Sequence, residues 1–437
     1  MKKIMSVIIA MVMVAAMCAQ AVPVSAQETM PTIERMSGRD RCETSCVIYE
    51  NTRALENANR TTVLIASGTN FADALAAIPY AAATGRPIML VSGKGAAEQK
   101  VLDKLRESNV EDVIILGGES AVSRETERSF NDAGIESRRI YGSSRYETAA
   151  KLATELSTHY SASKTIFLVS GENFPDALSV GAPAGRVKSA VLYSNKKGTI
   201  DEATAQYIRE YGIDTAVIVG GAGAVGANAE TELGKLGVES IRIYGENRFE
   251  TSIKVYQNYW RYHILKRVSV ATGTNFPDAL AGGVYSALSD MPILLVNNNG
   301  DNSELSRALA CNGENITEVV VYGGEGAVSD ATIEKIFVTG EKRWTSEAAL
   351  ESVTENVREY AESVGMHWNT ELSVDNAQHI VSDRWTTNTA YYTSADQLEK
   401  VLKDKIHACC INVGYDNVNV VFVDSGDGEY MAVCCFG

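Results

Sequence analysis

The octapeptide GTNFADAL at 68–75 recurs as GENFPDAL at 171–178 and as GTNFPDAL at 273–280. Two further motifs accompany each copy. The pattern R-x-x-G-x-x-R-x-E-T begins at Arg35, Arg139 and Arg242, and an apolar run ends in Gly-Gly at 117–118, 220–221 and 323–324. Equivalent residues of successive repeats are 103 or 104 positions apart, except that the second and third octapeptides are 102 positions apart. Three motifs in constant order and at nearly constant spacing identify a threefold internal repeat.

Each repeat alternates short apolar segments with helical ones. In the first repeat, the composition of buried strands is found at 62–67, 87–92 and 112–116. One helix is expected to begin at Asp73, and another is expected to follow Ser123, which would be its N-cap. Strands rich in Val, Ile and Leu that alternate with helices are typical of a parallel sheet covered on both faces. The sequence therefore predicts an α/β fold in which each repeat is a three-layer domain with its own core.

The repeated polar residues and glycines are candidates for a binding site. Ligands of open α/β sheets bind outside the carboxyl ends of the strands, where the G-x-N-F and Gly-Gly turns are expected. The arginine pattern suits a phosphate or a carboxylate ligand, because a guanidinium binds either one bidentately. The candidate residues are Arg35, Arg41, Arg139, Arg145, Arg242, Arg248, Asn70, Asp73, Asn173, Asp176, Asn275, Asp278, Gly117, Gly118, Gly220, Gly221, Gly323 and Gly324.

A structural interpretation of the same residues stays open. Asn and Asp can cap the following helix, a glycine pair permits a tight turn, and an arginine can pair with a carboxylate across a repeat boundary. The Gly-Gly motif that the three repeats share is not the G-x-G-x-x-G fingerprint, and the sequence has no G-x-x-x-x-G-K-[ST] loop, which argues against a nucleotide site. No catalytic set, cofactor or metal site is identified.

Net charge limits how the chain can bind an anion. The 40 Lys and Arg are outnumbered by 55 Asp and Glu, giving a formal charge of −15. This argues against a general nucleic-acid binder. Residues 35–337 carry 31 basic and 37 acidic residues, whereas 338–437 carry 7 and 16, so the acidity is concentrated at the C-terminal end. A polyanion would bind the repeats only through local arginines and turn amides.

The N-terminal segment has the pattern of a secretory signal peptide at 1–26. Lys2 and Lys3 precede an apolar run at 4–16, and small residues at 24–26 provide a cleavage site. No later stretch approaches about 18 consecutive apolar residues, so no membrane span is expected. The chain is therefore predicted to be exported.

The region 344–437 predicts a small α+β module. Strands are expected at 408–413, 418–424 and 430–436, with a hairpin turn at 426–428. In an exported protein the cysteines of two neighbouring strands are disulfide candidates, although a four-thiolate metal site and free thiols are alternatives. These candidates are Cys409, Cys410, Cys434 and Cys435.

The three repeats resemble the cell wall binding repeat 2 family of Gram-positive surface proteins, which includes clostridial S-layer-associated proteins. The resemblance is carried by GSSRYETA at 142–149, SGENFPDALS at 170–179 and VIILGGESAVS at 113–123. It implies one Rossmann- or Toprim-like domain per repeat, with three domains around a pseudo-threefold axis. It also implies non-covalent attachment to an anionic secondary cell wall polymer, with S-layer proteins as candidate neighbours.

On this basis repeats are assigned to 35–138, 139–241 and 242–338. The sequence departs from the pattern at Cys42, where the other repeats have Tyr146 and Phe249, and at 189–190, where Ser-Ala replaces a pair ending in proline. Two alternatives to a surface anchor are a wall-active amidase or peptidase that the repeats target, and a small soluble ligand at the strand ends. The C-terminal module shows no zinc or nucleophile signature, which disfavours the enzyme.

Overall fold

The computed structural model describes residues 30–260, 265–310 and 316–338, and short C-terminal segments at 358–359, 362–363, 367–368, 388–390, 417–424 and 430–436. The chain forms two units, one of 1–300 with 314–334 and one of 301–313 with 335–437. Within the described residues, no helix is long and apolar enough to cross a membrane.

The first sheet is parallel and has the strand order β3-β2-β4-β5. The strands β2, β3 and β4 are almost wholly buried, whereas β5, at the edge opposite β3, alternates exposed and half-buried residues before a buried end. The strands are β2 (Thr62–Ser67), β3 (Ile88–Val91), β4 (Asp112–Leu116) and β5 (Glu136–Ile140). The helices are α2 (Arg41–Ala54), α3 (Ala72–Thr84), α4 (Gln99–Glu107) and α5 (Arg124–Asp132).

The second sheet repeats this topology with the order β7-β6-β8-β9. Its central helix is divided into two short helices where the first domain has the single helix α3. The strands are β6 (Thr165–Ser170), β7 (Val191–Ser194), β8 (Thr215–Val219) and β9 (Glu239–Ile243). The helices are α6 (Arg145–His159), α7 (Pro175–Leu178), α8 (Gly181–Arg186), α9 (Glu202–Tyr211) and α10 (Asn228–Lys235).

The third sheet takes its fourth strand from the N-terminal end of the chain. Its order is β1-β12-β10-β11, and β1 pairs in parallel with β12 from Thr32↔Glu318 to Met36↔Tyr322. The strands are β1 (Thr32–Met36), β10 (Arg267–Thr272), β11 (Ile293–Val296) and β12 (Glu318–Tyr322). The helices α11 (Arg248–Trp260) and α12 (Pro277–Leu288) accompany this sheet, and α13 (Ser303–Ala310) and α14 (Asp330–Val338) follow β11 and β12 along the chain.

The N-terminal strand therefore closes the three domains into a ring. The strands β5, β9 and β1 are equivalent. Each contains the first arginine of the R-x-x-G motif of one sequence repeat, and each pairs with the sheet formed by another repeat. Arg139, the first residue of the second sequence repeat, thus lies in the last strand of the first sheet. The structural domains are offset from the sequence repeats by one strand.

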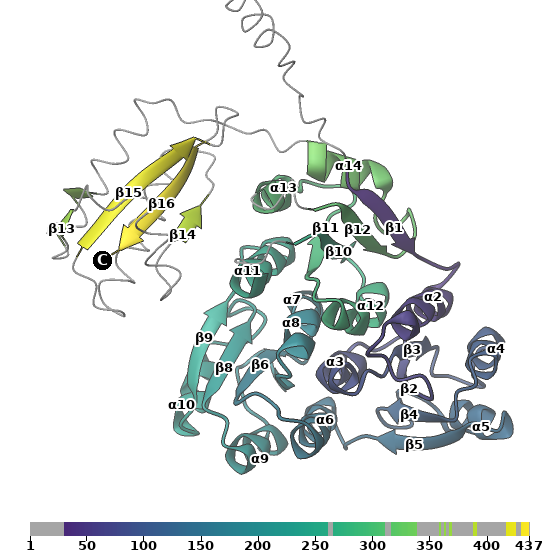
Figure 1. Ribbon diagram of the computed structural model, residues 1–437. Coiled ribbons are helices and arrows are strands. Elements are labelled where there is room, and N and C mark those ends of the chain that lie inside the picture. Colours follow the sequence, from purple (N-terminus) through teal and green to yellow (C-terminus); the bar gives the residue numbers. More distant parts are fainter. Residues whose placement is uncertain are drawn as a thin grey trace, which may run out of the picture. The chain divides into compact units, whose positions relative to one another are not determined.

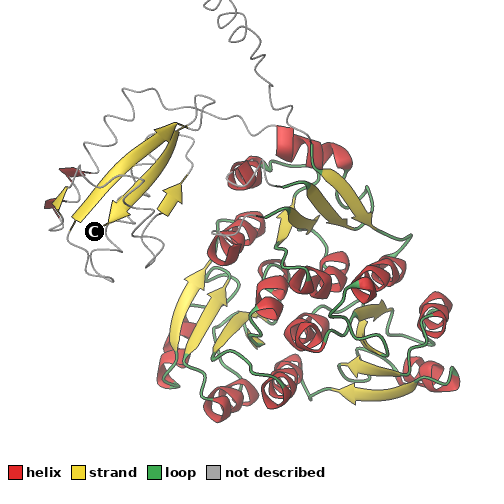
Figure 2. Ribbon diagram, in the orientation of Figure 1, coloured by secondary structure: helices red, strands yellow, loops and turns green. Residues whose placement is uncertain are grey.

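The helices α3, α8 and α12 pack against one another at the centre of the ring (Figure 1). Small residues let them approach closely. A Cβ at Gly181 or Gly283 would lie 2.7 or 2.5 Å from Cδ1 of Ile78. The expected fold class is confirmed: three α/β domains, each with a four-stranded parallel sheet between helices (Figure 2), surround a pseudo-threefold axis.

The C-terminal segments form a separate sheet with the order β13-β15-β16-β14. Its strands are β13 (His367–Trp368), β14 (Asn388–Ala390), β15 (Asn417–Asp424) and β16 (Tyr430–Phe436). The strands expected at 418–424 and 430–436 are confirmed as an antiparallel pair, with Val420 opposite Cys434. The signal peptide, the strand expected at 408–413, the turn at 426–428, and Cys409 and Cys410 lie outside the described residues.

Candidate functional site

The repeated motifs meet at the carboxyl edge of each sheet. In the first sheet the G-x-N-F turn follows β2, the Gly-Gly turn follows β4, and Tyr141 follows β5. Because the strands are parallel, the three segments lie along one edge, where α/β sheets bind ligands. The second and third sheets carry the same turns at the same edge.

The first glycine of each Gly-Gly pair adopts a backbone conformation that other residues rarely adopt. The φ angles of Gly117, Gly220 and Gly323 are 90°, 121° and 105°. A Cβ at Gly117 would also lie 2.2 Å from Oδ2 of Asp73, and one at Gly323 would lie 2.6 Å from Oδ2 of Asp278. The turn therefore requires glycine both for its backbone and for the close approach of a carboxylate.

These aspartates face the next repeat. Asp73 is 8% exposed and is flanked by the hydroxyl of Thr148 and the positive charge of Arg145, two residues of the next R-x-E-T motif. The equivalent groups are Asp176 with Thr251 and Arg248, and Asp278 with Arg41. The third group connects the third domain back to the first, so the aspartates join the repeats all around the ring.

The arginine of R-x-E-T completes this junction. Nη1 of Arg145 donates a hydrogen bond to the carbonyl of Gly171, and its guanidinium lies 5.8 Å from the ring centroid of Phe71. One side chain thus connects turns of two domains. The equivalent bonds run from Arg41 to Gly68 and from Arg248 to Gly273. This geometry supports the structural interpretation of the motif.

The arginine that opens each motif holds the Gly-Gly turn against the last strand. Arg139 donates to the carbonyls of Gly117 at 2.8 Å and Val122 at 3.0 Å, and pairs with Glu127 at 2.8 Å. Arg242 makes the same contacts with Gly220, Val225 and Glu230, and Arg35 bonds to Gly323 and Asp330. All three are bonded to protein groups.

The glutamate and threonine of R-x-E-T fix the entry of the following helix. The Glu147 carboxylate accepts from the Ser143 backbone N–H at 2.7 Å, and the Thr148 hydroxyl accepts from Gly142 N at 3.0 Å. Ser144 caps the helix by accepting from Glu147 N. The bond to Glu147 N satisfies an N–H of the first helical turn, and the other two hold the preceding loop residues Gly142 and Ser143 in place.

The phenylalanines of G-x-N-F meet at the pseudo-threefold axis. The ring centroids of Phe71 and Phe174 are 6.1 Å apart, those of Phe71 and Phe276 are 6.1 Å apart, and those of Phe174 and Phe276 are 5.3 Å apart. These distances are those of favourable aromatic pairs. One ring from each repeat therefore packs against the rings of the other two.

The asparagines differ from the other candidate residues. Asn70 Oδ1 accepts from Ala72 N at 3.2 Å, although Phe71 and not Asn70 is the N-cap residue of α3. Asn173 and Asn275 are exposed and accept only from the N–H of the next residue. Asp73 does not cap, since its carboxylate faces the neighbouring repeat. The asparagine amides and the second glycines of the pairs lie at the surface, and their assignment to polymer binding stays a prediction.

Burial raises the pKa of Asp73, although Thr148 and Arg145 partly oppose that shift. As pH falls, a carboxyl group whose pKa is raised by folding takes up its proton in the folded state before it does so in the unfolded state. The folded state is therefore increasingly stabilised as pH falls toward the pKa of the unfolded chain, near 4, and this stabilisation is lost as pH rises. The free energy of unfolding of the wild type, compared with that of Asp73→Asn, is therefore expected to rise as pH is lowered from 7 to 4. Urea unfolding of both proteins across this range measures it; a constant difference would contradict the expectation.

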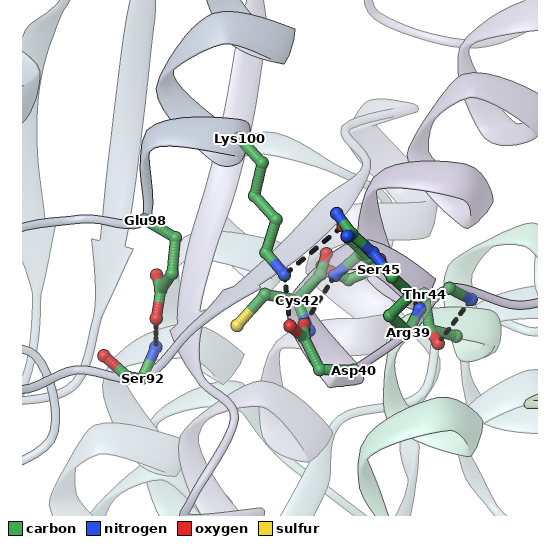
Figure 3. Close-up of polar contacts among 10 residues, drawn as sticks. Arg39, Asp40, Cys42, Thr44, Ser45, Ser92, Glu98 and Lys100 are labelled. Atoms are coloured by element: carbon green, nitrogen blue, oxygen red, sulfur yellow. Dashed lines mark hydrogen bonds and ion pairs between the residues drawn. The ribbon is translucent and has the colours of Figure 1, made fainter.

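Cys42 occupies the position where the other repeats have an aromatic ring. Figure 3 shows it beside Asp40, which pairs with Lys100, and near Glu98, which accepts from the backbone of Ser92. Cys42 is 5% exposed and Cys46, one helical turn on, is 7% exposed. Burial, with the Glu98 charge, raises the pKa of Cys42 to about 12, and burial raises that of Cys46 to about 12.

Both thiols are therefore expected to resist alkylation in the folded protein. A pKa near 12 instead of the usual 9 reduces the reactive thiolate about a thousandfold at neutral pH. Peptide mass spectrometry after iodoacetamide treatment should show Cys42 and Cys46 unmodified in native protein and fully modified in urea. Equal modification in both states would contradict the buried placement. Within the described part of the chain, no group of three or more His, Cys, Asp or Glu is placed to hold a metal ion.

Three sheets of one topology, closed by the N-terminal strand and carrying the same turns at each carboxyl edge, define a three-domain repeat module. Residues 35–127, 139–230 and 242–333 match Cell wall binding domain 2 (CWB2). These segments make up more than half of the chain, so the chain belongs to the CWB2 family.

Known relatives support this assignment. N-acetylmuramoyl-L-alanine amidase LytC of Bacillus subtilis is 30% identical over 299 residues, which are 68% of this chain and 56% of the amidase. The amidase enhancer of the same organism is 22% identical over 271 residues, 62% of this chain and 35% of the enhancer. The chain thus spans about half the length, or less, of these curated relatives.

Solved structures show the same fold. Cwp6 from Clostridium difficile has a TM-score of 0.64 and 21% identity, covering 79% of this chain and 59% of Cwp6. Cwp8 from Clostridium difficile has a TM-score of 0.62 and 24% identity, covering 70% of this chain and 52% of Cwp8. At these identities the likeness shows the shared three-domain fold.

Sequence reasoning missed the fourth strand of every domain. Its signal is an alternating pattern, as in ESRRI at 136–140 and ESIRI at 239–243, which is typical of a half-exposed edge strand. It also missed the aromatic cluster at the axis and the exposed positions of Tyr141 and Tyr244. A tyrosine directly before the motif glycine, present in two repeats, was the available signal.

Proposed function

We propose that the ring of three CWB2 domains anchors this protein non-covalently to an anionic secondary polymer of a Gram-positive cell wall. The signal peptide at 1–26 exports the chain, and residues 344–437 form the displayed module. The observation that carries the proposal is the presence of all three repeats, each with its motifs intact and joined in one closed ring. S-layer proteins are the candidate neighbours at the surface.

Local groups, and not net charge, must hold the polymer. The repeats carry more acidic than basic residues, so they offer no overall positive field. The carboxyl edges present exposed asparagines, the backbone of the Gly-Gly turns and nearby cations. Backbone N–H groups at such turns bind anions without a net positive charge.

An enzymatic role is not favoured by these comparisons. The amidase relative is 30% identical, and this chain matches only 56% of its length. The three repeats therefore support wall binding, which targeting and anchoring proteins share, without supporting hydrolysis.

Sedimentation with purified walls tests the proposal. The protein lacking residues 1–26 is mixed with walls of the producing bacterium before and after the anionic polymer is removed by acid extraction. We expect the protein to pellet with intact walls and to stay in solution with extracted walls. Equal pelleting with both preparations would contradict attachment to the polymer. The fragment must retain residues 30–36, because β1 completes the third sheet.

A further inference from the structure

Two tyrosines lie exposed at equivalent positions of the ring. Tyr141 follows β5 and Tyr244 follows β9, and each residue is 52% exposed. Only five large hydrophobic residues are exposed among the residues described, so two of the five share one position in the repeat. A residue that only fills a core would not be exposed to this extent in both copies.

Each tyrosine lies against the surface glycine of the neighbouring Gly-Gly turn. A Cβ at Gly118 would lie 3.8 Å from Cδ2 of Tyr141, and a Cβ at Gly221 would lie 3.7 Å from Cδ2 of Tyr244. The lack of a side chain at the glycine leaves the aromatic ring and the turn backbone side by side. This arrangement makes an open platform rather than a filled pocket.

A cation accompanies each ring. Nζ of Lys151 lies 5.9 Å from the centroid of Tyr141, and Nζ of Lys254 lies 6.0 Å from that of Tyr244. The lysines come from α6 and α11, the first helices of the following domains, and each pairs with the glutamate of R-x-E-T, at 3.1 and 2.9 Å. Lys151 also donates to the Tyr141 carbonyl at 3.0 Å.

This combination fits an acidic sugar. The apolar C–H face of a sugar ring stacks on an aromatic side chain, and a phosphate or carboxylate on that sugar can contact the adjacent ammonium group. We propose that Tyr141 with Lys151, and Tyr244 with Lys254, form two subsites for sugar units of the anionic polymer. This inference rests on the proposed wall anchoring and names the residues that perform it.

The third edge lacks both groups. Ser37 stands where the tyrosine is expected and Val47 where the lysine is expected. Its turn exposes two carboxylates, Glu325 at 61% and Asp330 at 50%, which pair with Arg35, and the first edge likewise exposes Glu119 at 56%. Without an aromatic platform this edge offers no face on which a sugar ring can stack, so we expect this chain to contact the polymer at two edges of its three.

Calorimetric titration with the purified anionic polymer released from walls of the producing bacterium tests the assignment. Tyr141→Ala and Tyr244→Ala are each expected to weaken binding about tenfold, and the double variant about a hundredfold. Tyr141→Phe and Tyr244→Phe keep the stacking face and are expected to bind like the wild type. Because the rings are half exposed, thermal unfolding of all variants should match the wild type.

The third edge supplies matched controls. Ser37→Ala is expected to leave affinity unchanged, whereas Ser37→Tyr combined with Val47→Lys should strengthen it. If the wild type binds the polymer and the folded Tyr141→Ala/Tyr244→Ala variant binds equally well, the two subsites are wrong while wall anchoring stands. If the wild type itself does not bind the polymer, the anchoring proposal fails and the subsites fail with it.

Discussion

Deleting residues 1–37 is expected to unfold the third domain although none of these residues belongs to the third sequence repeat. The deletion removes β1, its parallel pairing with β12 and the buried side chain of Met36. Lost strand bonds and lost burial together cost about 5 kcal/mol, which is comparable with the whole stability of many domains. Limited proteolysis and urea unfolding of the truncated chain measure the effect.

A rearranged chain separates the strand itself from its place in the sequence. The segment 30–37 can be moved to follow α14 through a short turn, as β5 follows α5 and β9 follows α10. We expect this chain to regain most of the lost stability. A truncation of residues 1–29 alone, which keeps β1, serves as the control and should unfold like the full chain. If deletion of 1–37 leaves the third domain resistant to protease, the ring closure by β1 is wrong.

Changing Arg145 to Met is expected to be the most damaging single substitution at a repeat boundary. It leaves the buried Asp73 carboxylate without its positive neighbour and removes the bond to the Gly171 carbonyl. Losing a hydrogen bond from a charged donor costs about 1.5–3 kcal/mol, and the loss of the positive charge near Asp73 adds to this cost. Urea unfolding of the variant gives this difference in free energy directly.

Two further variants decide whether Asp73 causes the loss. Adding Asp73→Asn to Arg145→Met should recover about half of the loss, because a neutral amide needs no counter-charge. Arg209→Met removes an exposed arginine that pairs with Glu202, and should change stability by less than about 0.5 kcal/mol. If Arg145→Met is as harmless as Arg209→Met, Arg145 does not join the repeats, and its assignment as a ligand contact becomes the better one.

Local features of each repeat were predictable from the sequence. The strand expected at 62–67 is β2 without any shift, Ser123 caps α5 through the backbone N–H of Thr126, and Pro175 and Pro277 occupy first helical positions. Each of these depends on a few adjacent residues, namely an apolar run, a short polar side chain or a proline whose missing N–H costs nothing at that position.

The ring closure was not predictable in this way. Thr32 pairs with Glu318, and no local pattern relates residues so far apart along the chain. The role of the motif arginines could not be determined from the sequence for a different reason. A guanidinium binds a protein carboxylate or a ligand phosphate with the same geometry, so the motif alone cannot distinguish them. The placement of Arg145 between Asp73 and Gly171 favours the structural role.

The wall-anchoring account depends most directly on contact between the ring and the polymer. Calorimetric titration of the protein lacking residues 1–26 with the soluble anionic polymer, and separately with polymer-free peptidoglycan fragments, measures that contact. We expect saturable binding to the polymer that weakens as salt is added, and no heat of binding with the fragments. Equal binding to both, or binding to the fragments alone, would contradict the account.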